Sequence, residues 1–166
     1  MRSRRIFGVG AAAPVKKYGL PASFGMIERM TEKTLILIKP DGVKRGLVGE
    51  ILRRIEAKGY LIDELKMLQA TDELLAEHYA EHLEKPFYPE MAAYMQSGPI
   101  VAAIIAGTRV VAGVRSLAGA TDPTTAAPGT IRGDFARAWD QGAIQNLIHS
   151  SDSLQSAQRE IAIWFK

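Results

Sequence analysis

A histidine near the C-terminal end of the chain stands among residues that could support covalent catalysis. His149 ends a strand predicted to include 146–148 and is followed by the polar run 150–153, where a helix is predicted to begin. Glu160 lies about two helical turns further on, so its carboxylate can fold back, and Ser151 adds a hydroxyl that can orient an imidazole. These groups predict a nitrogen nucleophile with its base and orienting partner. A structural histidine near a helix start is the alternative.

The other two histidines, His78 and His82, are four residues apart on a predicted helix, which is the spacing of a two-histidine metal face. Tyr79 stands where a zinc enzyme of that type needs its glutamate, and no third ligand is evident. We therefore expect both histidines to lie on a solvated helix face. The chain has no cysteine and no Gly-X-Ser-X-Gly motif, which excludes thiolate metal sites, cysteine nucleophiles and a serine nucleophile elbow.

Three basic residues stand at the ends of predicted elements and suggest phosphate recognition. They are Lys39, Arg115 and Arg132. Guanidinium forks and an ammonium point charge neutralise a transferring phosphoryl group. The chain has neither a Gly-X-X-X-X-Gly-Lys-Ser/Thr loop nor the Gly-rich loop of protein kinases, so side chains must hold any nucleotide.

The composition describes one globular domain with a basic leading segment. The chain has 166 residues, of which 47% are hydrophobic and 23% charged, and no apolar run reaches membrane-span length. Its net charge is +3, but residues 1–30 hold six basic groups against one acidic group, so they carry +5 and the rest carries −2. A slightly acidic body does not favour specific nucleic-acid binding.

We interpret residues 1–30 as a basic, disordered extension and residues 31–166 as the folded domain. An Arg-bearing leader poor in acidic residues is also compatible with an organellar transit peptide, whereas Met26 and Met30 would suit a start codon nearer the domain. Cytoplasmic localisation is the expectation, with organelle targeting as its alternative.

Hydrophobic periodicity predicts alternating strands and helices. Strands are expected at 34–38, 60–69, 100–106, 110–114 and 144–149, and helices at 47–58, 71–83, 88–96 and 153–165. Segment 39–42 is predicted to be a turn and 119–135 a long functional loop. This order predicts an α+β fold, a ferredoxin-like sandwich with helices covering an antiparallel sheet.

Three ordered motifs together resemble the nucleoside diphosphate kinase family. They are IKPDGV at 38–43 followed by RGLVGE at 45–50, PGTIRGDF at 128–135 and NLIHSSDS at 146–153. The similarity runs almost without interruption from residue 31 to residue 166. Two departures are Ser150, where the family most often has glycine, and extra residues between Phe135 and Asn146.

The resemblance implies a ping-pong reaction in which a phosphohistidine carries the γ-phosphate of a nucleoside triphosphate, typically ATP, to a nucleoside diphosphate. His149 matches the phosphorylated residue, and Phe87 matches the aromatic residue that stacks on the base. The positions that match phosphate and ribose contacts are Lys39, Arg115, Thr121, Arg132 and Asn146. Those that match residues positioning the imidazole are Tyr79, Ser151 and Glu160.

The resemblance also implies Mg²⁺ held through the nucleotide phosphates, with no direct protein ligand. It implies a homo-oligomer built from dimers, with a hexamer favoured over a tetramer, and no membrane partner. The alternative function is a non-catalytic nucleotide- or RNA-binding module with a ferredoxin-like fold. The chain lacks the paired aromatic strand motifs of RNA-recognition sheets, which weakens the RNA-binding form of this alternative.

Overall fold

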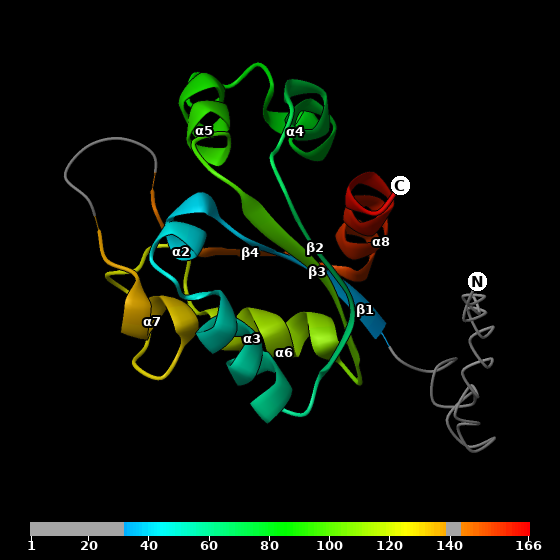
Figure 1. Cartoon of the computed structure of the whole chain (residues 1–166), viewed down its shortest axis with the longest axis vertical. Coiled ribbons are helices and arrows are strands. Elements are labelled where there is room, and N and C mark those ends of the chain that lie inside the picture. The colour runs from blue at the N-terminus through cyan, green and yellow to red at the C-terminus, as the bar shows by residue number, and fades with distance from the viewer. Residues whose placement is uncertain (1–31, 139–143) are drawn as a thin grey trace, which may run out of the picture.

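The computed structural model describes residues 32–138 and 144–166 and contains a four-stranded sheet (Figure 1). The strands are β1 (Glu32–Ile38), β2 (Leu61–Leu68), β3 (Ile100–Gly107) and β4 (Ile148–Ser150). Their order in the sheet is β2-β3-β1-β4, and every neighbouring pair is antiparallel. This arrangement confirms the predicted α+β ferredoxin-like sandwich.

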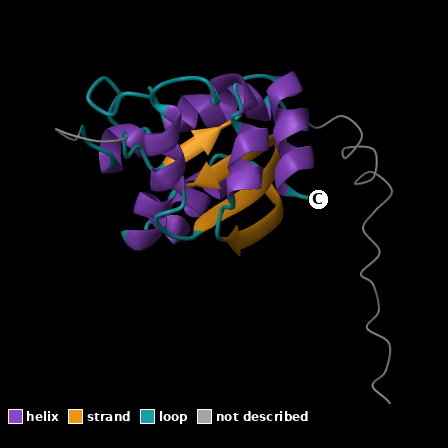
Figure 2. Cartoon of the chain, turned by 90° about the horizontal axis from the view of Figure 1, so that it is seen from above, coloured by secondary structure: helices purple, strands orange, loops and turns teal. Residues whose placement is uncertain are grey.

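Helices cover both faces of the sheet, as Figure 2 shows from above. One face is packed against α3 (Val48–Ala57), α6 (Val110–Ala118) and α7 (Ile131–Phe135). The opposite face is packed against α4 (Asp72–His78), α5 (Tyr88–Met95) and α8 (Leu154–Trp164). The described residues also contain two short helices, α2 (Pro40–Lys44) and the 3₁₀ helix η1 (Ala80–His82).

The two central strands are buried on both sides, which explains their uninterrupted apolar sequences. Ile36 and Ile38 of β1 belong to the core beneath α3 and α6, whereas Leu35 and Leu37 belong to the core beneath α4, α5 and α8. Side chains alternate between faces along a strand, so covering both faces requires apolar residues at every position. Each fully buried side chain of this size contributes about 1.5–3 kcal/mol. The rigid centre of the domain is therefore the pair β1–β3.

Several predicted elements are confirmed with small shifts of their ends. These are the strands expected at 34–38, 60–69 and 100–106 and the helices expected at 47–58, 88–96 and 153–165. The Ser153 hydroxyl accepts a hydrogen bond from the amide of Ser156 and so caps α8. Gly59, with φ +91°, follows α3 in the left-handed conformation.

Two predicted segments have the wrong structure. Segment 39–42 was expected to be a turn but enters α2, in which Pro40 takes the first helical position that its fixed φ favours. Segment 110–114 was expected to be a strand but begins α6. Its valines favoured a strand locally, yet Val110, Val114 and Ala118 are buried at helical spacing, so packing decided the outcome.

Other predicted boundaries were wrong by more than the usual fraying. Helix α4 stops at His78, and η1 replaces the rest of the expected helix. The long loop 119–135 contains α7, whose first turn is capped by the Thr130 hydroxyl. Strand β4 is Ile148–Ser150, so only the end of the expected 144–149 is strand. Leu154, the first residue of α8, is 49% exposed.

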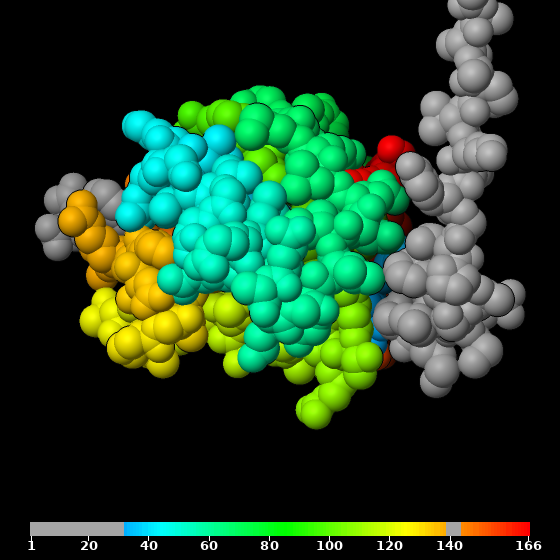
Figure 3. Space-filling model, turned by 60° about the horizontal axis from the view of Figure 1, so that its bottom comes forward, coloured from blue at the N-terminus to red at the C-terminus, as the bar shows by residue number. Residues whose placement is uncertain are grey.

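Helix α7 is tied to α3 by charged side chains. The Arg54 guanidinium lies 2.7 Å from the Asp134 carboxylate and stacks over the Phe135 ring, while Arg45 donates to the Phe135 carbonyl. Figure 3 shows this contact at the surface, where the cyan α2–α3 segment meets the yellow and orange segment that ends in α7. The loop that carries Thr121 and Arg132 is thereby anchored to the domain.

The prediction for residues 1–30 lies outside the described residues. Among the helices of the described part, none is long and apolar enough to cross a membrane.

Candidate active site

A pocket of about 490 Å³ opens where β4, α4, α6, α7 and α8 meet. Most of the predicted site residues line it. They are Lys39, Tyr79, Arg115, Thr121, Arg132, Asn146, His149 and Glu160. These residues are separated by up to 121 positions in the sequence. The fold therefore brings residues from separate motifs together in one pocket.

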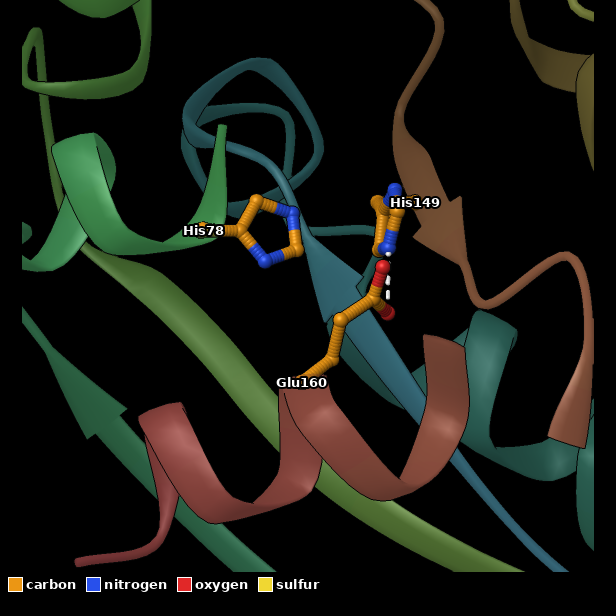
Figure 4. Close-up of side chains that lie close together, drawn as sticks. All are labelled: His78, His149 and Glu160. Carbon is orange, nitrogen blue, oxygen red and sulfur yellow. Dashed lines mark hydrogen bonds and ion pairs between the residues drawn. The ribbon is translucent and has the colours of Figure 1, made fainter. Parts of the chain in front are cut away.

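His149 lies on β4 with its ring partly exposed to this pocket. Its Nε2 is 2.9 Å from Oε2 of Glu160 (Figure 4). The same oxygen accepts a hydrogen bond of 2.7 Å from the Ser151 hydroxyl. Ser151 is in turn fixed to β1, because the Leu35 amide donates to its Oγ. The short connection between β4 and the Ser153 cap is what lets Glu160, two turns into α8, reach back to the strand.

This contact assigns different roles to the two ring nitrogens. A carboxylate only accepts hydrogen bonds, so neutral His149 carries its proton on Nε2 and leaves a lone pair on Nδ1. In Figure 4, Nδ1 lies at the end of the ring away from Glu160. Burial by itself raises the pKa of Glu160, but the hydrogen bonds and charge of His149 and the hydrogen bond of Ser151 bring that pKa below its usual value. The geometry thus leaves the Nδ1 lone pair available to act as a nucleophile.

Two cations lie at the base of the pocket and are already held in place. Lys39, which follows β1, donates from Nζ to Oδ1 of Asn146 at 2.7 Å, and burial together with Arg132 lowers its pKa to about 8. Arg132 of α7 donates to the carbonyls of Gly119, Asn146 and Ile148. Burial, with a smaller effect of Arg115, lowers the Arg132 pKa to about 10. A cluster of like charges with this burial is suited to binding an anion.

The remaining predicted contacts line the pocket nearer its opening. Arg115 of α6 and Thr121 are exposed, and the Asn146 amide donates to the Thr121 carbonyl at 2.8 Å. Phe87 is 50% exposed and does not line the pocket itself. Its ring centroid is 5.7 Å from that of His82, which does line the pocket, so Phe87 stands at the rim.

The comparisons with known proteins agree with this geometry. The family model described as nucleoside diphosphate kinase matches residues 32–166. Nucleoside diphosphate kinase from Rhodococcus erythropolis is 57% identical over 137 residues, which cover 82% of this chain and 96% of that protein. The enzyme of the same name from Mycobacterium tuberculosis strain H37Rv is also 57% identical, with 82% and 98% covered.

The chain belongs to the nucleoside diphosphate kinase family. Solved structures of family members have the same fold. The Borrelia burgdorferi kinase, described as a transition state mimic with vanadate and ADP, matches with a TM-score of 0.78 and 35% identity, covering 83% of this chain and 89% of that chain. The Halobacterium salinarum kinase in complex with CDP matches with a TM-score of 0.76 and 44% identity, covering 81% and 88%.

Two residues that shape this kinase site, Asp41 and Tyr94, were not predicted from the sequence. Leu147, two residues before His149, is fully buried with φ +70°, a strained conformation for a residue other than glycine. Its amide donates to one oxygen of the buried Asp41 carboxylate, and the Tyr94 hydroxyl donates to the other at 2.6 Å. Asp41 thereby holds the turn that directs Asn146 and His149 into the pocket. A turn motif and an isolated tyrosine gave no signal of this role.

The expectation that His78 lies on a solvated helix face was wrong. His78 is 4% exposed, and its Nδ1 accepts a hydrogen bond of 3.1 Å from the indole Nε1 of Trp164. Its ring centroid lies 4.8 Å from that of His149, and burial, followed by the effect of His149, lowers its pKa to about 3. His82 is separated from it by the end of α4, so the two do not share a helix face.

Three possible metal-binding groups do meet in the pocket, but they are not the pair His78 and His82, whose spacing is that of a metal face. Donor atoms of His78, His149 and Glu160 lie within 4.8 Å of one another. The indole of Trp164 is a donor only, so Nδ1 of His78 must accept and Nε2 must carry the proton of the neutral ring. The nitrogen directed toward His149 is therefore an N–H group, which argues against metal binding through this cluster.

Proposed function

We propose that this protein is a nucleoside diphosphate kinase, in which His149 accepts the γ-phosphate of a nucleoside triphosphate and passes it to a nucleoside diphosphate. The observation that carries this proposal is the bond between Nε2 of His149 and Glu160, which leaves the Nδ1 lone pair available. The family membership and the location of His149 in a cationic pocket support the same activity.

In the first half-reaction, the Nδ1 lone pair attacks the γ-phosphorus. The Nδ1–P bond forms while the bond from phosphorus to the bridging oxygen breaks, and the nucleoside diphosphate leaves with that electron pair. The proton on Nε2 stays in its hydrogen bond to Glu160, whose carboxylate balances the positive charge that the phosphorylated ring develops. The second nucleoside diphosphate reverses these steps.

The remaining predicted residues bind and orient the nucleotide. Lys39, Arg115 and Arg132 offer positive charge to the phosphates. Thr121 and Asn146 are proposed contacts of the phosphates and ribose, and Phe87 offers its exposed ring face to the base. Stacking tolerates any base, so we propose broad nucleobase selectivity. Tyr79, half-buried in the pocket wall, and Ser151 keep the imidazole in position, and burial near Glu160 raises the Tyr79 pKa so that its hydroxyl stays protonated.

Mg²⁺ is proposed to be held through the nucleotide phosphates rather than by a protein cage. The ion prefers oxygen ligands in an octahedral arrangement. The acids that line the pocket within the described residues are Glu81, Asp152 and Glu160, and Glu160 is already committed to His149 and Ser151. Bound phosphates would supply the oxygen ligands, and the ion would lower the charge that opposes attack on phosphorus.

Intact-mass spectrometry at neutral pH tests the phosphohistidine directly. Purified protein is mixed briefly with Mg-ATP and then chased with GDP. We expect one added phosphate that disappears on the chase and never forms in His149→Ala. His82→Asn, the matched change of an exposed histidine, retains it. A phosphate that persists in His149→Ala, or its absence from wild-type protein that binds nucleotide, would contradict the proposal.

A non-catalytic nucleotide- or RNA-binding module is the competing function. RNA-binding ferredoxin-like domains commonly present an open sheet face with aromatic side chains. Here both faces of the described sheet are covered by helices, which makes that mode of binding unfavourable. Salt-sensitive RNA binding together with no phosphate exchange would support this alternative.

The assembly that we propose is a homo-oligomer built from dimers, with a hexamer favoured over a tetramer. Within the described residues, β2 has a strand neighbour on one side only. It carries Leu61, Leu65 and Met67, which are 55%, 48% and 58% exposed. An apolar edge strand of this kind invites pairing with a second copy. Light scattering on size-exclusion fractions should give the oligomer mass, and Leu65→Lys should reduce it.

For localisation we propose the cytoplasm, with organelle targeting by residues 1–30 as the alternative. Only the basic composition of that segment bears on the choice. Fluorescent fusions of the full chain and of a chain starting at Met30 should show the same distribution if the segment is not an address.

A further inference from the structure

A buried histidine with no part in the reaction described above contacts the ring of the nucleophile. His78 and His149 have interplanar angle 82°, and Figure 4 shows the nitrogen-bearing edge of His78 directed toward the flat side of the His149 ring. An edge-to-face contact of this kind places the positive rim of one ring against the negative face of the other. His78 therefore restricts the plane of the His149 ring from the side that Glu160 does not contact.

The identity of that edge is fixed by Trp164. The indole N–H donates to Nδ1 of His78, so neutral His78 carries its proton on Nε2, the nitrogen nearer His149 in Figure 4. Trp164 is 1% exposed and belongs to the core, so this donor is firmly held. Glu160 and Trp164 lie one turn apart on α8, and each determines the proton position on one of the two histidines.

We propose that His78 is a positioning residue for His149, and that Trp164 maintains the tautomer in which His78 acts. The N–H edge of His78 disfavours positive charge on the His149 ring. It thereby fixes the direction of Nδ1. This inference rests on the proposed function, because it takes His149 as the nucleophile.

Other charged groups around His149 act on the same protonation equilibrium. Lys39 after β1, Arg115 of α6, Arg132 of α7 and Arg159 of α8 disfavour the imidazolium, whereas Glu160 and Asp152 favour it. Tyr79, which directly follows α4, is neutral because burial raises its pKa. Among these groups, Glu160 is within hydrogen-bond distance of His149, and His78 contributes the edge-to-face contact. The pH dependence of the reaction should therefore be sensitive to His78.

Two substitutions separate the role of His78 from simple packing. Trp164→Phe keeps an aromatic ring but removes the indole donor, and His78→Phe keeps a ring against His149 but removes the N–H edge. In both variants we expect the acidic limb of the kcat/KM profile to move upward by about half a pH unit, which lowers kcat/KM on that limb about threefold. Ile55→Ala, in the core on the opposite face of the sheet from Trp164, should destabilise the protein and leave the limb in place.

Nitrogen-15 NMR of histidine-labelled wild-type protein tests the tautomer without relying on any variant. We expect His78 to be neutral, with its proton on Nε2, and to lose this preference in Trp164→Phe. A proton on Nδ1 of wild-type His78, or an unchanged acidic limb in both folded variants, would overturn the inference. Phosphoenzyme formation is measured on the same samples. If the phosphoenzyme forms but the acidic limb of the kcat/KM profile is unchanged in both variants, only the role of His78 is rejected. If the phosphoenzyme does not form in wild-type protein, the proposed function is rejected as well.

Discussion

The floor and the rim of the pocket differ in how completely they are organised before a nucleotide binds. The floor consists of Lys39, Arg132, Asn146 and Glu160, all of which are hydrogen-bonded to other residues of the domain. Arg132, Asn146 and Glu160 are 8%, 3% and 5% exposed. The rim consists of Arg115, Thr121 and Phe87, all exposed. A floor fixed by the fold stabilises the transition state without reorganising, whereas the rim makes its contacts only when substrate arrives. Floor substitutions should therefore alter kcat and stability, and rim substitutions mainly KM.

The largest effect is expected for the floor carboxylate. Glu160→Gln retains the shape of the side chain but removes the charge that balances the phosphorylated ring, so kcat should fall about 100-fold or more. Steady-state exchange assays measure this change. Glu81→Gln, which alters an exposed carboxylate lining the same pocket, is the matched control and should change kcat less than about twofold. An equal fall of kcat in Glu160→Gln and Glu81→Gln would show that a buried carboxylate of the floor matters no more than an exposed one.

Two arginines provide the next comparison. Arg132→Ala removes the guanidinium hydrogen bonds to the carbonyls of Gly119, Asn146 and Ile148. It should lower the free energy of unfolding by about 2–4 kcal/mol, besides weakening phosphate binding. Arg115→Ala should raise the nucleotide KM about tenfold and leave the free energy of unfolding unchanged. Urea denaturation and steady-state kinetics measure both quantities. A stability loss in Arg115→Ala similar to that in Arg132→Ala would show that the rim is also structural.

Lys39, in the floor of the pocket, should cause the kcat/KM of the reaction to fall at alkaline pH. The Lys39 pKa is lowered to about 8, chiefly by burial, so raising the pH through that value removes the proton and the positive charge from Nζ. Nucleotide kcat/KM, which reports on the free enzyme, should fall as this charge is lost. Lys39→Arg keeps its charge to higher pH and should move the limb upward by about one unit or more, at reduced activity. A limb that remains near pH 8 in this variant would assign it to another group.

The smallest effect is expected behind the floor, at Tyr94. Tyr94→Phe removes one hydrogen bond to Asp41 but keeps the ring and the second contact, from the Leu147 amide. The free energy of unfolding should fall by about 1–2 kcal/mol, and kcat should fall a few-fold because the turn before His149 loosens. Tyr88→Phe, a half-buried tyrosine on the same helix, is the control. No difference between the two variants would exclude a role for the Asp41–Tyr94 contact in holding Leu147.

Elements whose sequence signals lie within the element itself were predicted well, and elements that depend on distant contacts were not. The apolar runs of β1 and β3 and the cap at Ser153 are local features, and the structure has these elements. The structure of segment 110–114 depends on tertiary packing. A valine-rich segment favours a strand by itself, but here Val114 and Ala118 are buried on one side of a helix.

The site shows the same division. Long ordered motifs drew attention to His149, Lys39 and Arg132, and the fold places all three in one pocket. The burial of His78 was not predictable, because its partner Trp164 is 86 positions away and the helical spacing around His78 equally suits an exposed face. Asp41 was hidden within a motif that resembles a turn, and only the conformation of Leu147 explains why a buried carboxylate is needed there.

The most direct test of the account is to determine which atom carries the phosphate. Protein labelled with nitrogen-15 at histidine is phosphorylated with Mg-ATP, and the phosphorus–nitrogen coupling is measured by NMR at neutral pH. Because Glu160 holds Nε2 of His149, the account predicts phosphate on Nδ1 of that residue. Phosphate on Nε2, or on a residue other than His149, would contradict it.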